Sequence, residues 1–154
     1  MLNNDVIRSV RYILNVNDQK IIEIVALSGL IVSFDEIRDI LAAEEDPNFL
    51  VCDDELMAHF LDGLIYFRRG RDKTKPGIPF ELPMTNNLIL KKLRVAFELK
   101  EEDIHETLKL AGFSLGRSEM SAFMRKRDHP NYRECGDQVL RYFLKGLKLR
   151  IRGA

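Results

Sequence analysis

The chain contains 154 residues, of which 45% are hydrophobic, and its 24 lysines and arginines balance 24 aspartates and glutamates. This composition is typical of a globular protein and excludes an intrinsically disordered chain. No apolar run approaches the roughly 18 to 20 residues of a membrane span, and the first residues show no signal-peptide pattern, so we expect a cytoplasmic protein without membrane contact.

Four helices are predicted in the first 70 residues, because apolar side chains recur there at spacings of three and four positions. Their expected ranges are 3–14, 18–28, 33–44 and 53–70. The inward face of the second helix is expected to hold Ile21, Ile24, Val25 and Leu27. We expect Asn3 or Asn4 to cap the first helix, Ser33 to cap the third, and Gly29 to end the second in a left-handed turn. Pro47 lies in the loop after the third helix, because proline cannot continue a helix.

Residues 71–83 contain three of the five prolines and show no helical period, so they are predicted to form an extended linker. Ile78, Phe80 and Leu82 alternate within this segment. The alternation indicates that the linker lies along a groove, and no strand is expected outside it.

The remaining chain repeats the first part. A segment of nine residues that begins at Asp46 returns 83 positions later at His129, and the same offset carries Asn3-Asn4 onto Asn86-Asn87 without a gap. Two copies that share caps, turns and core positions are two copies of one folded unit. We therefore predict an all-α fold of two tandem four-helix repeats, which occupy residues 1–70 and 84–154.

Each repeat of about 70 residues would be marginal alone, so we expect the repeats to share one core across a pseudo-twofold axis. Gly63 and Gly146 recur inside the fourth helix of each repeat, where glycine costs roughly 1 kcal/mol relative to alanine. Close approach of another helix or backbone is the expected reason, with the other repeat's fourth helix as the candidate neighbour, and a ligand against the glycine is the alternative. The predicted repeat-packing residues are Phe60, Gly63, Phe143 and Gly146.

Cys52 and Cys135 hold matching positions near a helix N-terminus, where the helix dipole can lower a thiol pKa. Small buried side chains are the first interpretation and a reactive pair is the alternative; both thiols are expected to stay reduced in the cytosol. The three histidines, His59, His105 and His129, do not recur between repeats and lack zinc-ligand spacing, so we predict no metal. No nucleophile elbow, phosphate loop or dinucleotide motif is present, so we predict no cofactor and no enzyme activity.

Arg11 and Arg94 recur in the first helices, and Glu23 and Glu106 recur in the second helices. A charge pair between adjacent helices of each repeat is the first interpretation. An anion site at the repeated arginine is the alternative.

The two repeats differ sharply in charge. Residues 1–71 hold 7 basic and 13 acidic residues, net −6, while residues 84–154 hold 15 and 9, net +6. Opposite charges on related surfaces favour contact between the repeats or self-association of two chains, and a basic repeat can also attract nucleic acid. We expect the third helices of the two repeats to mediate a weak, salt-sensitive self-association.

Residues 99–127 resemble a helix-turn-helix, with basic residues at the end of the second helix. The equivalent helix of the first repeat is acidic and would repel phosphates, so only the second repeat can bind nucleic acid. The possible anion or nucleic-acid contacts are Arg94, Arg117, Arg125, Lys126, Arg127 and Arg133.

The sequence also resembles the YehS-like family of bacterial proteins over essentially its whole length. The resemblance is carried by the stretches Met1–Asp5, Glu44–Pro47, Asn87–Arg94 and Tyr132–Gln138. It implies a bacterial cytoplasmic protein with two copies of a domain of unknown function, and it supplies no catalytic residues. The preferred hypothesis is a non-catalytic binding or interaction protein with a protein partner or a second copy of itself. Nucleic-acid binding by the second repeat is the alternative.

Overall fold

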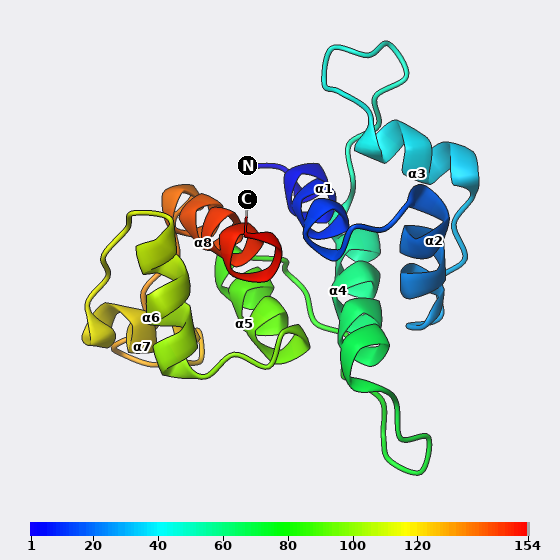
Figure 1. The fold of residues 1–154 in the computed structure, drawn as a ribbon. Helices are drawn as coiled ribbons and strands as arrows, with labels where there is room; N and C mark the ends of the chain where they lie inside the picture. Colours follow the sequence, from blue (N-terminus) through cyan, green and yellow to red (C-terminus); the bar gives the residue numbers. More distant parts are fainter. Residues whose placement is uncertain (154) are drawn as a thin grey trace. The chain divides into compact units, whose positions relative to one another are not determined.

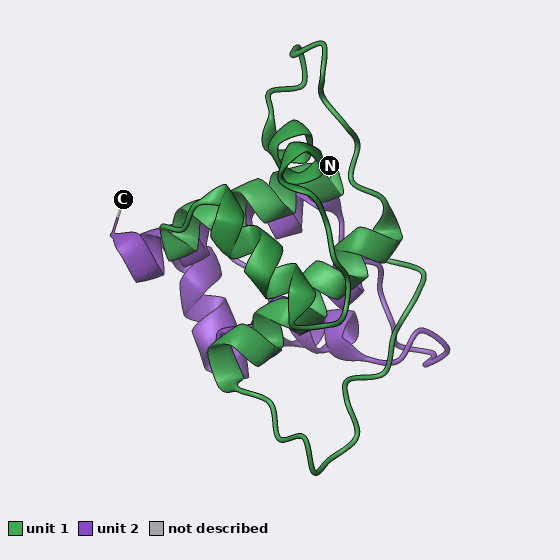
Figure 2. Cartoon of the chain, turned by 90° about the vertical axis from the view of Figure 1, so that its right-hand side faces the viewer, with its two compact units in different colours: residues 1–84 green, residues 85–154 purple. Residues whose placement is uncertain are grey.

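In the computed structural model, which describes residues 1–153, the chain forms eight helices, and no strand occurs in that range. It divides into two compact units, unit 1 (Met1–Met84) and unit 2, which begins at Thr85 (Figure 2). Unit 1 contains α1 (Asn3–Leu14), α2 (Asp18–Ala26), α3 (Phe34–Leu41) and α4 (Asp54–Arg69) (Figure 1). Unit 2 contains α5 (Asn86–Ala96), α6 (Glu101–Leu110), α7 (Arg117–Met124) and α8 (Asp137–Arg152). The predicted all-α fold of two tandem four-helix repeats is confirmed.

The longest helix of each unit carries the centre of its core. Phe60 on α4 and Phe143 on α8 are both fully buried. Around them lie the apolar faces of the other helices, and α2 packs closely on α4 as α6 does on α8. None of the described helices is long and apolar enough to cross a bilayer.

The repeated glycines permit these two helix pairs to approach each other. A Cβ atom on Gly63 would lie 2.9 Å from the carbonyl carbon of Ile24 and closer still to its oxygen. On Gly146 it would lie 2.7 Å from the carbonyl carbon of Thr107. The predicted close approach of another helix backbone is therefore confirmed. The neighbour is α2 or α6 of the same unit, and the suggested partner, the fourth helix of the other repeat, is wrong.

Several helix ends differ from the predicted ranges for local reasons. The Ser33 hydroxyl accepts the Glu36 amide at 3.1 Å, which confirms this cap. However, α3 ends at Leu41, because Ala42 is extended with ψ of 162°. Leu27 lies just beyond α2 and is 46% exposed, so it does not belong to the core.

The linker contacts α4 of unit 1 along part of its length. The Ile78 amide donates to the Tyr66 hydroxyl at 2.7 Å, and the Phe80 ring lies 5.2 Å from the imidazole of His59. Figure 1 shows the loop after α3 and the segment after α4 projecting from opposite ends of unit 1.

Candidate binding surface

A buried asparagine holds the loop that carries most of the predicted contact residues. Asn87 is 4% exposed, and its amide nitrogen donates to the carbonyl oxygens of Phe123 at 3.1 Å and Arg133 at 2.7 Å. Its amide oxygen accepts the Cys135 backbone N–H at 2.9 Å. One side chain thus satisfies three backbone groups, which joins the start of α5 to the end of α7 and to the following loop.

Its neighbour Asn86 holds the end of the same loop. The Asn86 amide nitrogen donates to the Cys135 carbonyl oxygen at 3.0 Å and to the Asp137 carboxylate at 2.8 Å. We call Asn86 and Asn87 the asparagine clamp of unit 2.

Unit 1 contains the same clamp, formed by Asn3 and Asn4. Asn4 is fully buried and donates to the carbonyl oxygens of Ile40 and Leu50, both at 2.8 Å, while accepting the Cys52 N–H at 2.9 Å. The expectation that Asn3 or Asn4 caps α1 is therefore wrong. Leu2 is the cap residue, and its N–H donates to the Asp5 carboxylate at 2.9 Å, which leaves both asparagine amides free for the loop.

Beside this loop in unit 2 lies a cavity of about 490 Å³. Its wall on α7 and the following cap residue contains Ser118, Glu119, Ser121, Ala122 and Arg125, and its wall on the loop contains Pro130, Asn131, Tyr132 and Arg133. The loop is fixed against the helix, because the Arg133 N–H donates to the Ala122 carbonyl oxygen at 3.3 Å. Two cations, several hydroxyl and amide groups and one carboxylate therefore face one hollow.

The structure separates the six predicted contact residues. Arg125 and Arg133 line the cavity, whereas Arg117, Lys126 and Arg127 are exposed near it without lining it. Within the described chain none of these five side chains pairs with a carboxylate. We call the five residues the basic surface.

Arg94 has a different role from the one predicted. It is partly buried, and its Nε donates to the Leu99 carbonyl oxygen at 3.0 Å, which holds the turn after α5. The equivalent Arg11 lies with its Nε 3.0 Å from the Asp18 carboxylate at the start of α2. The expected arginine–glutamate pairs are not formed, because Glu23 pairs with Lys20 at 3.1 Å. In unit 2, Glu106 lies 3.5 Å from Arg150.

The helix-turn-helix resemblance is weaker in three dimensions than in sequence. The second helix, α7, contains only eight residues, and Arg117 is its single basic residue. Arg125, Lys126 and Arg127 follow its end, where Arg125 is the C-terminal cap with ψ of 161°. The basic side chains therefore extend from a turn, and they do not line the face of a recognition helix.

The corresponding part of unit 1 has the same frame and the opposite charge. The acidic residues on α3 and its loop, which we call the acidic surface, are Asp35, Glu36, Asp39, Glu44, Glu45 and Asp46. Arg38 pairs with Asp35 and Asp39, both at 3.2 Å, so it offsets part of this charge. Glu44, Glu45 and Asp46 are exposed on the loop.

Cys52 and Cys135 follow these loops in the chain, and both are buried free thiols. Burial, followed by the charges of Asp53, Asp54 and Glu36, raises the pKa of Cys52 from 9.0 to about 12. Burial, followed by the charge of Asp137, raises the pKa of Cys135 to about 11. Both thiols are therefore protonated near neutral pH, which argues against a reactive pair, because the thiolate is the nucleophile.

Four neutral residues that line the cavity were not predicted from the sequence: Ser118, Ser121, Asn131 and Tyr132. Asn131 and Tyr132 belong to the repeated proline loop, and this repetition could have identified them as candidate site residues. The serines gave no signal, because Asp35 and Arg38 occupy their positions in the first repeat.

The fold and the clamp define a class of protein: an all-α tandem repeat in which one buried asparagine per unit fixes an exposed loop, and the charges of this loop differ between the two units. The chain belongs to the family described as protein of unknown function (DUF1456), whose model matches residues 3–70 and 86–153. It is 45% identical over 150 residues to the uncharacterized protein YehS of Escherichia coli strain K12, covering 97% of this chain and 96% of that protein. No solved structure matches the chain significantly.

Proposed function

We propose that the protein is a non-catalytic cytoplasmic binding protein whose basic surface holds an acidic protein partner. The observation that carries the proposal is the reversal of charge on an unchanged frame. The clamp bonds of Asn4 and Asn87 have the same pattern, yet the loops above them carry Glu44, Glu45 and Asp46 in unit 1 and Arg127 and other cations in unit 2.

The acidic surface of a second copy is one partner with the required charge. Single exposed ion pairs contribute about 0.2–1 kcal/mol, so several must form together to hold two chains. Such an association would be weak and sensitive to salt, because the screening length falls from about 30 Å at 0.01 M to about 8 Å at 0.15 M ionic strength.

Sedimentation velocity across a salt series tests this proposal. We expect association at low salt that is lost at physiological salt. The double variant Arg125→Glu/Arg133→Glu should be monomeric at every salt concentration, whereas Lys109→Glu, an exposed charge reversal on α6, should behave as the parent chain. Substitution of the Arg133 side chain leaves its backbone bonds to Asn87 and Ala122 in place.

Mixing supplies a second test. The double variant combined with a Glu44→Arg/Glu45→Arg chain should associate again, because the first chain keeps the acidic surface, the second keeps the basic surface, and the reversed charges also complement each other. A parent chain that is monomeric at every salt concentration would refute self-association. A dimer that strengthens with salt would instead indicate an apolar interface.

Nucleic acid is a second candidate partner, favoured by the position of Tyr132 beside the basic surface. Aromatic rings stack on bases and cations contact phosphates, so this combination is typical of single-strand binding. Mobility shifts with short DNA and RNA at about 50 mM salt should then weaken when Arg125, Lys126 and Arg127 are replaced by glutamine. Absence of a shift under these conditions would exclude this candidate.

A further inference from the structure

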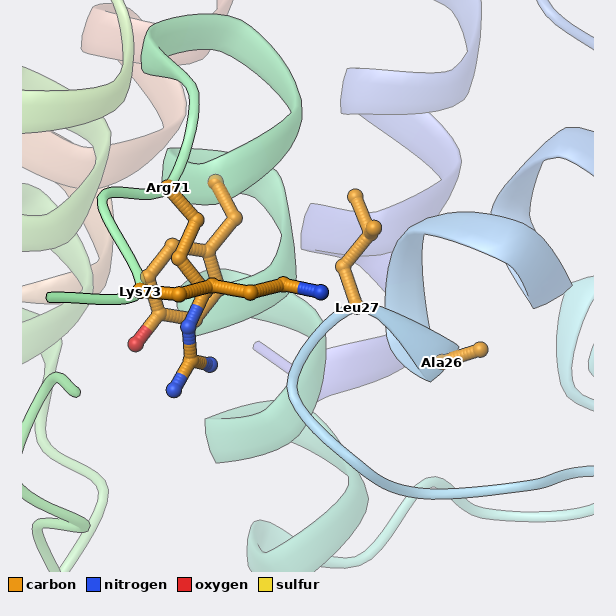
Figure 3. A pocket seen from close by; sticks show the side chains of 5 residues that line it. Ala26, Leu27, Arg71 and Lys73 are labelled. Atoms are coloured by element: carbon orange, nitrogen blue, oxygen red, sulfur yellow. The ribbon is translucent and has the colours of Figure 1, made fainter.

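A second cavity lies in unit 1, at the end of α4 away from the acidic surface. It measures about 490 Å³ and is lined by Ala26 and Leu27 at the end of α2, by Tyr66 of α4, and by Arg71 and Lys73 of the linker (Figure 3). All five residues belong to unit 1. The cavity is therefore formed within one compact unit.

One cation of this cavity is held in place by an aromatic ring. The guanidinium carbon of Arg71 lies 4.6 Å from the centre of the Tyr66 ring. The Tyr66 hydroxyl accepts the Ile78 N–H at 2.7 Å, so the ring is itself fixed by the returning linker. A Cβ on Gly77 would lie 3.1 Å from both Arg71 Nη2 and the Tyr66 hydroxyl, which shows how closely the turn covers this pair. Because the guanidinium is held before any ligand arrives, it loses little freedom on binding.

The second cation, Lys73, belongs to the same linker as Arg71. Figure 3 shows the Lys73 side chain extending toward Leu27 across the gap between the linker and α2. Neither Lys73 nor Arg71 pairs with a carboxylate in the part of the chain that the structure describes. The intervening Asp72 is engaged elsewhere, since it accepts the Thr74 N–H at 3.0 Å and the Thr74 hydroxyl, and these bonds lower its pKa.

This pair of cations is unexpected in a unit whose first 71 residues carry a net charge of −6. It is also not part of the repeated architecture, because the position of Tyr66 holds Leu149 in unit 2. The fold therefore does not require the stacked tyrosine and arginine. Beside them Leu27 remains 46% exposed, so an apolar surface adjoins two unpaired positive charges.

From this arrangement we infer that the cavity binds a small organic anion, a carboxylate attached to a short hydrocarbon group. The carboxylate lies between Arg71 and Lys73, where charge-assisted hydrogen bonds form. The hydrocarbon group covers Leu27 and the edge of the Tyr66 ring, which removes apolar surface from water. A volume of about 490 Å³ lies within the range of small-molecule sites.

The test is a titration of the full chain followed by amide NMR, with hexanoate as the probe. Acetate lacks the hydrocarbon group and hexylammonium reverses the charge. We expect hexanoate to shift the amides of Leu27 and Lys73 and to bind about tenfold more tightly than either analogue. Acetate or hexylammonium binding as tightly as hexanoate would overturn the proposed ligand class, and no shift at these amides would overturn the site.

Variants of exposed residues separate this site from a general charge effect. Lys73→Gln should weaken hexanoate binding about tenfold, whereas the control Lys75→Gln, with the same loss of charge two positions along the linker, should leave it unchanged. Leu27→Ser should reduce hexanoate binding to the level of acetate. Equal weakening by Lys73→Gln and Lys75→Gln would refute the proposal.

Discussion

Replacing Gly63 by alanine tests the packing of α2 on α4. On an open helix this change stabilises by roughly 1 kcal/mol, because alanine has the higher helix propensity. Here the added Cβ would lie 2.9 Å from the Ile24 carbonyl carbon, while ordinary contact begins at 3.4 Å. The two helices must separate by at least the difference, 0.5 Å, and by more at the carbonyl oxygen.

This separation disturbs the packing of α2 on α4, in which Ile21 and Ile24 of α2 are both 0% exposed. Overpacking of a core costs about 1–3 kcal/mol, and the upper end applies because the obstructing group is backbone. After the gain in helix propensity, we expect a net loss of about 1–2 kcal/mol. A domain of 100 residues or fewer would then melt several degrees lower.

Urea denaturation followed by circular dichroism measures this loss as a lower midpoint. The control is Gly136→Ala, since a Cβ at that position meets nothing within 4 Å and the backbone φ of −72° suits alanine. A Gly63→Ala chain as stable as the parent, or more stable, would refute the packing argument. If the Gly146→Ala chain were also as stable as the parent, the same argument for the packing of α6 on α8 in unit 2 would be refuted.

Three further predictions concern the clamp, a helix cap and the thiols. Asn4→Asp keeps the shape of the side chain but cannot donate hydrogen bonds to the two buried carbonyl oxygens. It should therefore destabilise the chain by about 3 kcal/mol or more at pH 7, with partial recovery at a pH where the new carboxyl group is protonated. A urea midpoint unchanged at pH 7 would contradict the role of the clamp. Gly136→Asp restores at α8 the side-chain cap that Asp53 provides in unit 1, so it should stabilise the chain by about 0.5 kcal/mol. The melting temperature should rise, and an unchanged melting temperature would contradict this cap. The thiol of Cys52 stays protonated in the folded chain up to a pKa of about 12, whereas the unfolded chain loses this proton near 9.0, so stability should fall as pH rises through that window by up to about 1.4 kcal/mol per pH unit. Cys52→Ala should reduce this alkaline slope in urea midpoints measured between pH 8 and 10.5, and an identical slope would show that other groups cause it.

The sequence predicted the repeat architecture because caps and apolar spacing are local properties. It could not assign Asn4 correctly, since an asparagine near a helix start has the same local signature whether it caps that helix or binds a distant loop. The bonds from Asn4 reach Ile40, Leu50 and Cys52, and only the folded chain brings these groups together.

The glycines show a related limit. Their repetition at Gly63 and Gly146 indicated a close approach, but the partner depends on how the four helices of a unit fold together. For the same reason, only part of the candidate surface was predicted from the sequence. A run of charges identifies Arg125 and its neighbours, whereas the inclusion of Ser118 and Tyr132 in one cavity depends on the loop being held against α7.

In the asparagine clamp, the hydrogen bonds that hold the loop are independent of the side chains that the loop exposes to solvent. The bonds of Asn87 run from one buried side chain to backbone groups, so they place few demands on the side chains that point outward. Pairs such as Glu44 and Arg127 can therefore diverge freely between the units while the loop keeps its path. Such a loop is a natural grafting position. Foreign recognition sequences placed in residues 43–49 or 126–132 should fold onto the same frame, which would make each unit a small helical scaffold for two independently chosen binding loops.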